Sequence, residues 1–372
     1  MKKIKTLAFY LPQYHPIPEN DEWWGKGFTE WTNVGKAKPL FEGHEQPIYP
    51  ADLGYYDLRV PEVREQQAQM ARDYGVYGFI YYHYWFGNGK QLLERIAYEV
   101  LKSGKPDFPF CFCWANETWS GIWHGLKDKV LAEQIYSDED LIAHFEYLLP
   151  FFKDSRYIKV DNKPVLVVYD PIHLQDKAPE YLEKFNTLAK ENGFSGLYLI
   201  ASNKTEDNYG YHHLGYQAKI SNAFMRAWRP HMNKRPSISA KQYYTNRIKG
   251  ILGFKTVSFQ KPVDIQNAPD VVNDLHFDET DVDTFPCLIP NWDNTPRSGN
   301  RGIILGNNSP ELFEKQVEKA VDFLKDKHYP ENFLVVKSWN EWAEGNILEP
   351  DRKNGFGYLN ALKKILSKKG QL

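Results

Sequence analysis

The sequence predicts an α/β fold, a single (β/α)8 barrel of the TIM type with long loops after strands 1 and 6. Eight short runs of strand length are almost continuously apolar, as expected for parallel strands that are buried on both faces. Segments with helical periodicity lie between these runs. No Gly-rich nucleotide-binding turn follows any of them, which disfavours the alternative of a doubly wound open sheet.

The predicted strands are distributed along the whole chain, and helical patterns separate them. Ser309 is a suitable helix N-cap before Pro310, and apolar residues then recur at helical spacing up to Leu324. Similar patterns follow Pro61 and Ser137. The strands are expected at residues 4–11, 76–85, 108–114, 165–169, 196–201, 217–221, 285–292 and 333–339.

Two stretches are too long to be simple connections. The first covers residues 12–59 and contains three tryptophans, and the second covers residues 222–283. Basic residues gather in the second stretch between residues 226 and 249. This basic stretch is interpreted either as a solvated charged face or as a contact for an acidic sugar or a phosphate-bearing substrate.

Composition excludes several classes of protein. With 46 basic and 48 acidic residues among 372, the net charge of -2 gives no electrostatic reason to expect a nucleic acid partner. Because α/β barrels often exceed about 250 residues in one domain, we expect a single catalytic domain over residues 1–372.

The start of the sequence and the cysteines indicate the cellular compartment. The basic start is not followed by a signal-peptide pattern, and no apolar run approaches the roughly 18 residues of a membrane span. Cys111, Cys113 and Cys287 are expected to be buried free thiols. We therefore expect a cytoplasmic protein. No His, Asp or Glu spacing resembles a metal motif, so no metal or other cofactor is expected.

Aromatic residues make up 15% of the chain, and many of them stand with polar residues directly after the predicted strands. In an α/β barrel these positions form the active-site face. Flat rings stack on the apolar faces of sugars, while amides and carboxylates bind hydroxyl groups. We expect an oligosaccharide or polysaccharide substrate here, contacted by Tyr10, Gln13, His15, His83, Tyr84, Trp85, Trp114, Asn116, Glu117, Trp292, Asp293, Arg297, Trp339, Asn340 and Trp342.

The catalytic candidates are Glu341 and Glu344, which follow the last predicted strand. If the turn between them is helical, their spacing puts both carboxylates on one side. Two close carboxylates do not ionise together easily, so one is held as a general acid while the other acts as a base or nucleophile. Cleavage of a glycosidic bond requires such a pair. Glu117 is the competing candidate, with a structural role at the barrel rim as its alternative.

Six motifs spread in order over nearly the whole chain resemble those of the WbsX-type proteins. They are FYLPQYH at 9–15, GFTEW at 27–31, HYWF at 83–86, WANE at 114–117, WDNTPR at 292–297 and WNEWAEG at 339–345. The WbsX-type group is similar to glycoside hydrolase family 99 and is commonly found with polysaccharide and lipopolysaccharide O-antigen assembly. The resemblance implies a (β/α)8 barrel.

The resemblance also implies chemical roles. Family 99 comprises endo-acting α-mannosidases and α-mannanases that retain anomeric configuration without a metal. By this likeness Glu341 takes the proton of the sugar 2-hydroxyl, which attacks the anomeric carbon, and Glu344 is the general acid. Ala343 stands where the hydrolase family has His, a departure that bears on the choice of sugar.

Three functions are therefore compared. The first is a retaining glycoside hydrolase or transglycosylase acting on α-linked glycans of bacterial surface polysaccharide. The alternative is a sugar-nucleotide-dependent glycosyltransferase of lipopolysaccharide O-antigen biosynthesis. Asp281 and Asp283 match the metal-binding D-x-D pattern of such enzymes, but Asp138 and Asp140 match it equally well, so the pattern does not indicate a metal site. The third is a glycan-binding scaffold without catalysis, which the presence of both glutamates disfavours.

Overall fold

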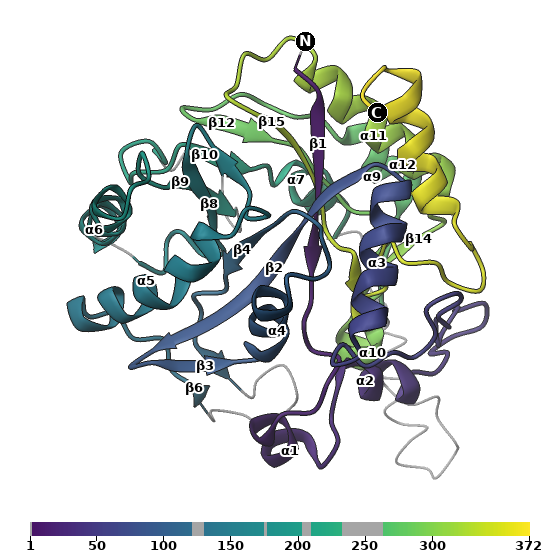
Figure 1. Ribbon diagram of the computed structural model, residues 1–372. Coiled ribbons are helices and arrows are strands. Elements are labelled where there is room, and N and C mark those ends of the chain that lie inside the picture. Colours follow the sequence, from purple (N-terminus) through teal and green to yellow (C-terminus); the bar gives the residue numbers. More distant parts are fainter. Residues whose placement is uncertain (1, 121–129, 175–176, 203–209, 233–262) are drawn as a thin grey trace, which may run out of the picture.

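The centre of this computed structural model, which describes residues 2–120, 130–174, 177–202, 210–232 and 263–372, is a nearly closed barrel of parallel strands (Figure 1). Each of the eight predicted apolar runs contributes to it, so the predicted α/β barrel is confirmed. In spatial order the strands are β12 (Asp283–Phe285), β10 (Ala218–Ile220), β9 (Tyr198–Ser202), β8 (Lys163–Val168), β4 (Phe110–Trp114), β2 (Val76–Gly87), β1 (Ile4–Tyr10), β15 (Asn332–Val336) and β13 (Cys287–Leu288).

The seventh predicted strand is divided into two halves. β12 pairs with β10, whereas β13 pairs with β15 on the other side. Pro286 lies between the halves. Proline has no backbone N–H, so it interrupts a ladder of strand hydrogen bonds. One short stretch of chain thus connects the two edges of the sheet, and this explains why nine strands arise from eight predicted runs.

Helices surround the strands on the outside of the barrel (Figure 1). The predicted N-caps are confirmed, because the hydroxyls of Ser137 and Ser309 accept hydrogen bonds from Asp140 and Leu312 backbone nitrogens. The longer helices are α3 (Pro61–Asp73), α4 (Arg95–Ser103), α5 (Asp138–Lys153), α6 (Ala178–Glu191), α7 (Ala223–Met232), α11 (Pro310–Leu324) and α12 (Gly357–Lys368).

Short elements decorate the barrel ends. They are the helices α1 (Pro18–Trp24), α2 (Glu30–Lys36), α9 (Ala268–Asp274), α10 (Thr295–Ser298), η3 (Gly299–Arg301) and η4 (Trp342–Glu344). They also include β3 (Lys90–Leu92) beside β2, β7 (Lys159–Val160) beside β8, and the pairs β5 (Trp119–Ser120) with β6 (Val130–Ala132), β11 (Asp264–Asn267) with β14 (Ile303–Gly306), and β16 (Asn340–Glu341) with β17 (Asn346–Ile347).

The two long predicted loops carry several of these elements. The loop after β1 contains α1 and α2, and the loop after β10 contains α7, β11 and α9. Within the basic stretch, Arg226 forms an ion pair with Asp278 at 2.8 Å. The basic residues at 234, 235, 241, 247 and 249 lie outside the described residues.

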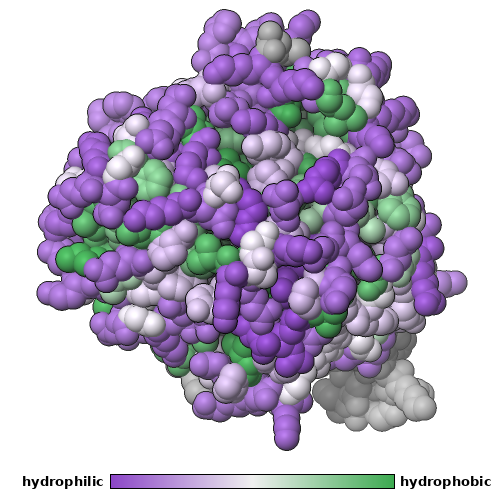
Figure 2. All heavy atoms as spheres, in the orientation of Figure 1, coloured by the Kyte–Doolittle hydropathy of each residue, from purple (hydrophilic) through white to green (hydrophobic). Residues whose placement is uncertain are grey.

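Burial follows the expected pattern. All three cysteines are buried and free, and hydrophilic residues cover most of the face in Figure 2. Among the described residues, no helix combines the length and apolar character needed to cross a membrane.

Candidate active site

The turn after β15 carries both candidate glutamates. Its β16 and β17 strands pair antiparallel around η4, a single turn of 3-10 helix. Since a 3-10 helix has three residues per turn, side chains three positions apart lie above one another. Glu341 directly precedes η4 and Glu344 ends it. The helical turn expected from the sequence is therefore present, and contacts of both glutamate side chains with one arginine, Arg297, place them on a common side.

Gly345 allows this turn to approach a second loop closely. Its φ of +59° is left-handed, and a Cβ there would lie 3.0 Å from the backbone nitrogen of Asp293. That nitrogen donates a hydrogen bond to the Glu344 carbonyl oxygen at 2.7 Å. The loop that continues into α10 is thus fixed against the glutamate turn.

Arg297 of α10 connects three carboxylates. Its Nη1 donates to Glu344 Oε1 at 2.6 Å, and its Nη2 donates to Glu341 Oε2 at 3.0 Å. Its Nε and Nη2 also donate to Glu30 Oε1 of α2, at 2.9 and 2.5 Å. One guanidinium therefore joins the predicted glutamate pair to a third glutamate from the loop after β1.

The two glutamates of the predicted pair have different surroundings. Glu341 is only 5% exposed. Burial raises the pKa of Glu341 to about 7, with a further contribution from the negative charge of Glu344, while Arg297 opposes the rise. A carboxyl group with this pKa can both bind and release a proton near neutral pH.

Lys337 supplies a second positive charge near the pair. Its ammonium lies over the ring of Tyr169, 5.6 Å from the ring centroid. Burial by itself lowers the pKa of Lys337. Tyr169, Glu344 and Glu341 raise it by more, so the pKa of Lys337 lies above its ordinary value. Together Glu30, Arg297, Lys337, Glu341 and Glu344 form the Arg297 cluster, whose three carboxylates and two cations become neutral when one proton is bound.

Two tyrosines of β2 face the Arg297 cluster. Burial raises the pKa of Tyr82 and of Tyr84, and in both the negative charge of Glu341 is the next largest cause. The two rings stack with centroids 6.2 Å apart, and Trp119 meets Tyr84 edge-on at 5.0 Å. The barrel interior thus presents an aromatic wall beside Glu341, as sugar stacking requires.

Four of the predicted contact residues point away from this interior. Tyr10 Oη donates to Gln67 of α3 at 2.7 Å. Trp85 Nε1 donates to Asp140 of α5 at 3.0 Å. In the same outer layer, His83 pairs with His144 of α5 at 2.8 Å, and Trp114 Nε1 donates to the Trp85 carbonyl oxygen at 2.9 Å. Alternate residues of a strand face opposite sides, so these four side chains lie beneath the helices.

Two of the predicted amides hold the ends of strands together. Asn116 exchanges two hydrogen bonds with the backbone of Asp170, at 2.7 and 2.8 Å. Asn340 does the same with Leu11, at 2.8 and 3.1 Å. Both side chains are fully buried. Their amide groups therefore position the loops that form the barrel mouth.

The Asp293 carboxylate is held by hydrogen bonds from neighbouring loop residues. One carboxylate oxygen accepts hydrogen bonds from His44 at 2.9 Å and Gln46 at 2.7 Å, and the other accepts two from Thr295. These contacts fix the start of α10, where Arg297 lies. Trp292 packs edge-on against Trp228 at 6.0 Å. A cavity of about 780 Å³ is lined by both Trp292 and Asp293.

The remaining predicted residues differ in their burial. Gln13 and Glu117 are half-buried, and His15 is buried. Burial lowers the pKa of His15. The Gln13 carbonyl oxygen accepts from the Glu30 backbone nitrogen at 2.9 Å. Trp339 and Trp342 are fully buried, so both belong to the core beneath the pair.

Glu349 is the centre of a second buried network. Gln67 donates to its Oε1 at 2.6 Å, while Tyr56 and Trp342 donate to its Oε2 at 2.9 and 2.6 Å. Burial raises the pKa of Glu349 to about 7, although these hydrogen bonds lower it. Tyr56, Gln67, Trp342 and Glu349 form the Glu349 cluster, and through Trp342 it supports the turn between the two candidate glutamates.

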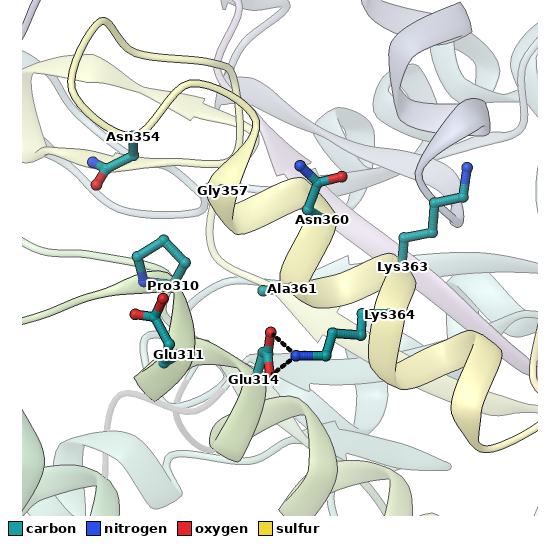
Figure 3. Close-up of a pocket in the computed structure, with 9 residues that line it drawn as sticks. All are labelled: Pro310, Glu311, Glu314, Asn354, Gly357, Asn360, Ala361, Lys363 and Lys364. Carbon is teal, nitrogen blue, oxygen red and sulfur yellow. Dashed lines mark hydrogen bonds and ion pairs between the residues drawn. The ribbon is translucent and has the colours of Figure 1, made fainter.

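A second cavity lies elsewhere on the molecule. The groove between α11 and α12 has a volume of about 710 Å³, and an ion pair between Glu314 and Lys364 crosses it at 2.8 Å (Figure 3). No aromatic ring and no predicted site residue lines it. This groove lacks the stacking surface expected of a sugar site.

A family comparison agrees with this architecture. Residues 6–362 match the family model described as "Glycosyltransferase WbsX". The chain belongs to the WbsX family. Membership supports a carbohydrate-active enzyme, and the match runs from within β1 through all the other strands of the barrel.

Two relatives of this WbsX-family chain come from Xanthomonas campestris. Proteins described as "Uncharacterized protein WxcX" from two strains of Xanthomonas campestris pv. campestris are 35% identical over 97% of this chain. The match covers 49% of each relative. The chain therefore spans about half the length of the curated relatives it matches.

Solved structures share the barrel of the WbsX-family chain. A "Glycoside hydrolase-like protein" superimposes with a TM-score of 0.58 at 15% identity, covering 98% of this chain and 94% of the other. A GH99 endo-alpha-mannosidase from Bacteroides thetaiotaomicron superimposes with a TM-score of 0.52 at 14% identity, covering 98% and 96%. At these identities the likeness concerns the fold.

Several residues of the WbsX-family site were not expected from the sequence. Glu30 lies in one of the six motifs, but it follows no strand, so the strand-end criterion misses it. Lys337 lies within the last predicted apolar run. Tyr82 could have been found by applying the two-residue alternation of a strand to its neighbour Tyr84. Glu349 gives no sequence signal beyond its charge.

Proposed function

We propose that this chain is a retaining glycoside hydrolase or transglycosylase, with α-linked glycans of bacterial surface polysaccharide, of the lipopolysaccharide O-antigen or capsule type, as substrates. Glu341 and Glu344 are its catalytic pair. The observation that carries the proposal is the Arg297 bridge between these two glutamates after the last barrel strand. This is the face where the active sites of α/β barrels lie.

Further support comes from the surroundings of the pair. The pKa of about 7 for Glu341 suits proton transfer near neutral pH. The rings of Tyr82, Tyr84 and Trp119 offer stacking surfaces for a sugar. Family membership and the shared fold of a GH99 endo-alpha-mannosidase agree with glycan chemistry.

The proposed reaction has two steps. In the first, Glu341 takes the proton of the 2-hydroxyl, whose oxygen attacks the anomeric carbon, while Glu344 protonates the departing glycosidic oxygen. In the second, Glu344 takes a proton from water or from an acceptor hydroxyl, which opens the 1,2-anhydro sugar, and Glu341 returns its proton to the 2-oxygen. Two inversions at the anomeric carbon give overall retention.

Turnover of α-linked mannooligosaccharides is the first experiment, because a solved neighbour is an endo-alpha-mannosidase. We expect product whose newly formed reducing end is initially the α anomer, as observed by proton NMR. The variants Glu341→Gln and Glu344→Gln should each lower kcat roughly 10²- to 10⁴-fold, since each removes one proton-transfer group.

The matched control is Glu311→Gln. Glu311 lines the groove between α11 and α12, so this same chemical change should leave kcat within about twofold. If Glu344→Gln keeps the full rate on any responsive α-glycoside, the catalytic assignment is wrong. Release of the β anomer would exclude the retaining reaction.

A sugar-nucleotide-dependent glycosyltransferase is the second candidate, and the family description favours it. The D-x-D match at Asp281 and Asp283 does not add to this case. Asp283 begins β12 and accepts a hydrogen bond from Tyr198 at 3.1 Å. Active sites of α/β barrels lie at the other ends of the strands.

Calorimetric titration tests this second candidate. GDP-mannose and UDP-glucose, each with Mg²⁺, are suitable probes, and a transferase predicts saturable heat with one of them. Absence of heat with both, together with turnover of an α-glycoside, would favour the hydrolase or transglycosylase.

A further inference from the structure

One positive charge in the site is shared by three carboxylates from distant parts of the chain. Glu30 comes from α2, whereas Glu341 and Glu344 come from the turn after β15. All three accept hydrogen bonds from the guanidinium of Arg297. An arginine side chain keeps its proton in proteins, so its charge cannot adjust to the number of its partners.

The three carboxylates do not share Arg297 equally. Glu30 is 1% exposed and accepts from both Nε and Nη2. Glu344 accepts a hydrogen bond from Nη1 at 2.6 Å, and neither of the other two carboxylates shares this donor. Glu341 receives only the Nη2 group that already binds Glu30, and its contact is longer, at 3.0 Å. Glu341 is thus the least compensated member of the pair, in the more buried position.

The other charged and titratable groups around Glu341 do not reverse this order. Glu344 and Glu30 add negative charge, while Lys337 adds positive charge and is placed to act on Glu344 as well. Tyr82 and Tyr84 are neutral near pH 7, because burial raises the pKa of each. The geometry of the Arg297 contacts therefore decides between the two glutamates.

We propose that Glu30 is a positioning residue that acts through Arg297 and places the single proton of the catalytic pair on Glu341 in the protein without a bound glycan. This inference rests on the proposed function, because it concerns the same two glutamates. It adds a third carboxylate to the site, and this carboxylate touches neither of the reacting groups.

A consequence follows for the reaction. The proposed first step needs the opposite arrangement, with Glu341 ionised and Glu344 protonated. Binding of the glycan must therefore be accompanied by transfer of one proton from the Glu341 carboxyl to the Glu344 carboxylate, with no other change of charge. Arg297 Nη1 binds only Oε1 of Glu344, so Oε2 can carry the transferred proton toward the departing glycosidic oxygen. Glu30 retains Arg297 through Nε and Nη2 when this happens.

The test needs no substrate. Carbon-13 NMR of the protein labelled at its glutamate carboxyl groups follows each ionisation as pH changes. Two glutamates, Glu341 and Glu349, should titrate near pH 7. The variants Glu341→Gln, Glu344→Gln and Glu349→Gln assign the signals, because each removes its own resonance.

Glu30→Gln is the deciding variant. Loss of its negative charge frees Arg297 for Glu341, so the titration midpoint of Glu341 should fall by about one pH unit. Glu349 is the internal control, because its contacts are with neutral donors, and its midpoint should not move. Glu30→Asp keeps the charge but shortens its reach, and we expect a smaller shift in the same direction.

Two results would overturn the inference. One is a titration near pH 7 that disappears in Glu344→Gln and persists in Glu341→Gln. The other is a Glu341 midpoint that neither Glu30 variant changes. If Glu30→Gln does not fold, as judged by circular dichroism, Glu30→Asp alone decides. Failure of the proposed function appears separately, as absence of turnover in a protein whose carboxyl titrations follow the expected pattern.

Discussion

The Arg297 cluster and the Glu349 cluster both contact the turn after β15, and each contains a buried glutamate with different surroundings. In both, burial raises the pKa of a glutamate to about 7. Around Glu349 the partners are neutral donors. Around Glu341 they are two further carboxylates and two cations.

The same raised pKa therefore arises in two kinds of environment, one fixed and one that a ligand can change. The partners of Glu349 are held in the core and carry no charge, so nothing that enters the barrel mouth alters its surroundings. Arg297 is 26% exposed at its side chain and holds Glu341 and Glu344 together. An incoming ligand can redistribute that charge. A shifted pKa identifies a functional group only when the groups that shift it can change.

Removing the cation of the Arg297 cluster should have the largest effect on stability. In Arg297→Met three carboxylates lose their shared partner, and we expect the free energy of unfolding at pH 8 to fall by about 3 kcal/mol. The loss should be smaller at pH 5. Arg297 opposes the rise in the pKa of Glu341, so without the arginine the folded-state pKa of Glu341 lies further above its unfolded value, and stability is lost as pH rises through it. Urea unfolding at both pH values measures this.

The control is Arg59→Met, which breaks an exposed ion pair with Asp57. Its cost should stay below about 1 kcal/mol at either pH. An equal effect of the two variants would mean that the Arg297 cluster behaves like surface charge.

Glu349→Gln should change the pH dependence of stability. The folded-state pKa of about 7 lies above the ordinary value of 4.5, so the contribution of this group is present below pH 4.5 and is lost as pH rises through 7. The wild type should therefore lose about 3 kcal/mol more than the variant between pH 4 and pH 8, at about 1.36 kcal/mol per pKa unit. Parallel stability curves for the two proteins would show that Glu349 ionises normally.

Gly345→Ala tests the turn that joins the two clusters. A left-handed φ of +59° costs an alanine about 1 kcal/mol, and its Cβ would meet the backbone of Asp293 at 3.0 Å. We expect a loss of about 2 kcal/mol in thermal or urea unfolding. Gly355→Ala has a similar φ of +52° with no atom within 4 Å of the added Cβ, so it isolates the conformational cost. If both variants lose the same amount, the close approach to Asp293 adds nothing.

The barrel was predictable because burial on both faces produces continuous apolar runs. Each run contains a strand, and the serine caps and proline starts of α3, α5 and α11 are where the sequence puts them. The division at Pro286 was harder to foresee. A proline can also occur at the start or the edge of a strand, and only the pairing on both sides shows that the chain changes neighbour there.

The site was less predictable than the fold. The spacing of Glu341 and Glu344 indicates their common side, but the run of aromatic residues near the end of β2 does not show by itself which side chains face the barrel interior. Tyr84 faces the cluster, whereas His83 and Trp85 face α5. The contact between Glu30 and Arg297 joins residues 267 positions apart, and no local pattern encodes such a contact.

The pairing of β1 with β15 has a consequence for the order in which parts of the molecule fold. Leu11 and Asn340, whose exchange of hydrogen bonds fixes the end of β1, are 329 positions apart. Contacts of such high sequence separation form late, because the entropy of closing the intervening chain is lost first. Glu341 and Glu344 immediately follow this contact. The turn that carries the two glutamates is therefore fixed against the end of β1 only when the first and last barrel strands meet.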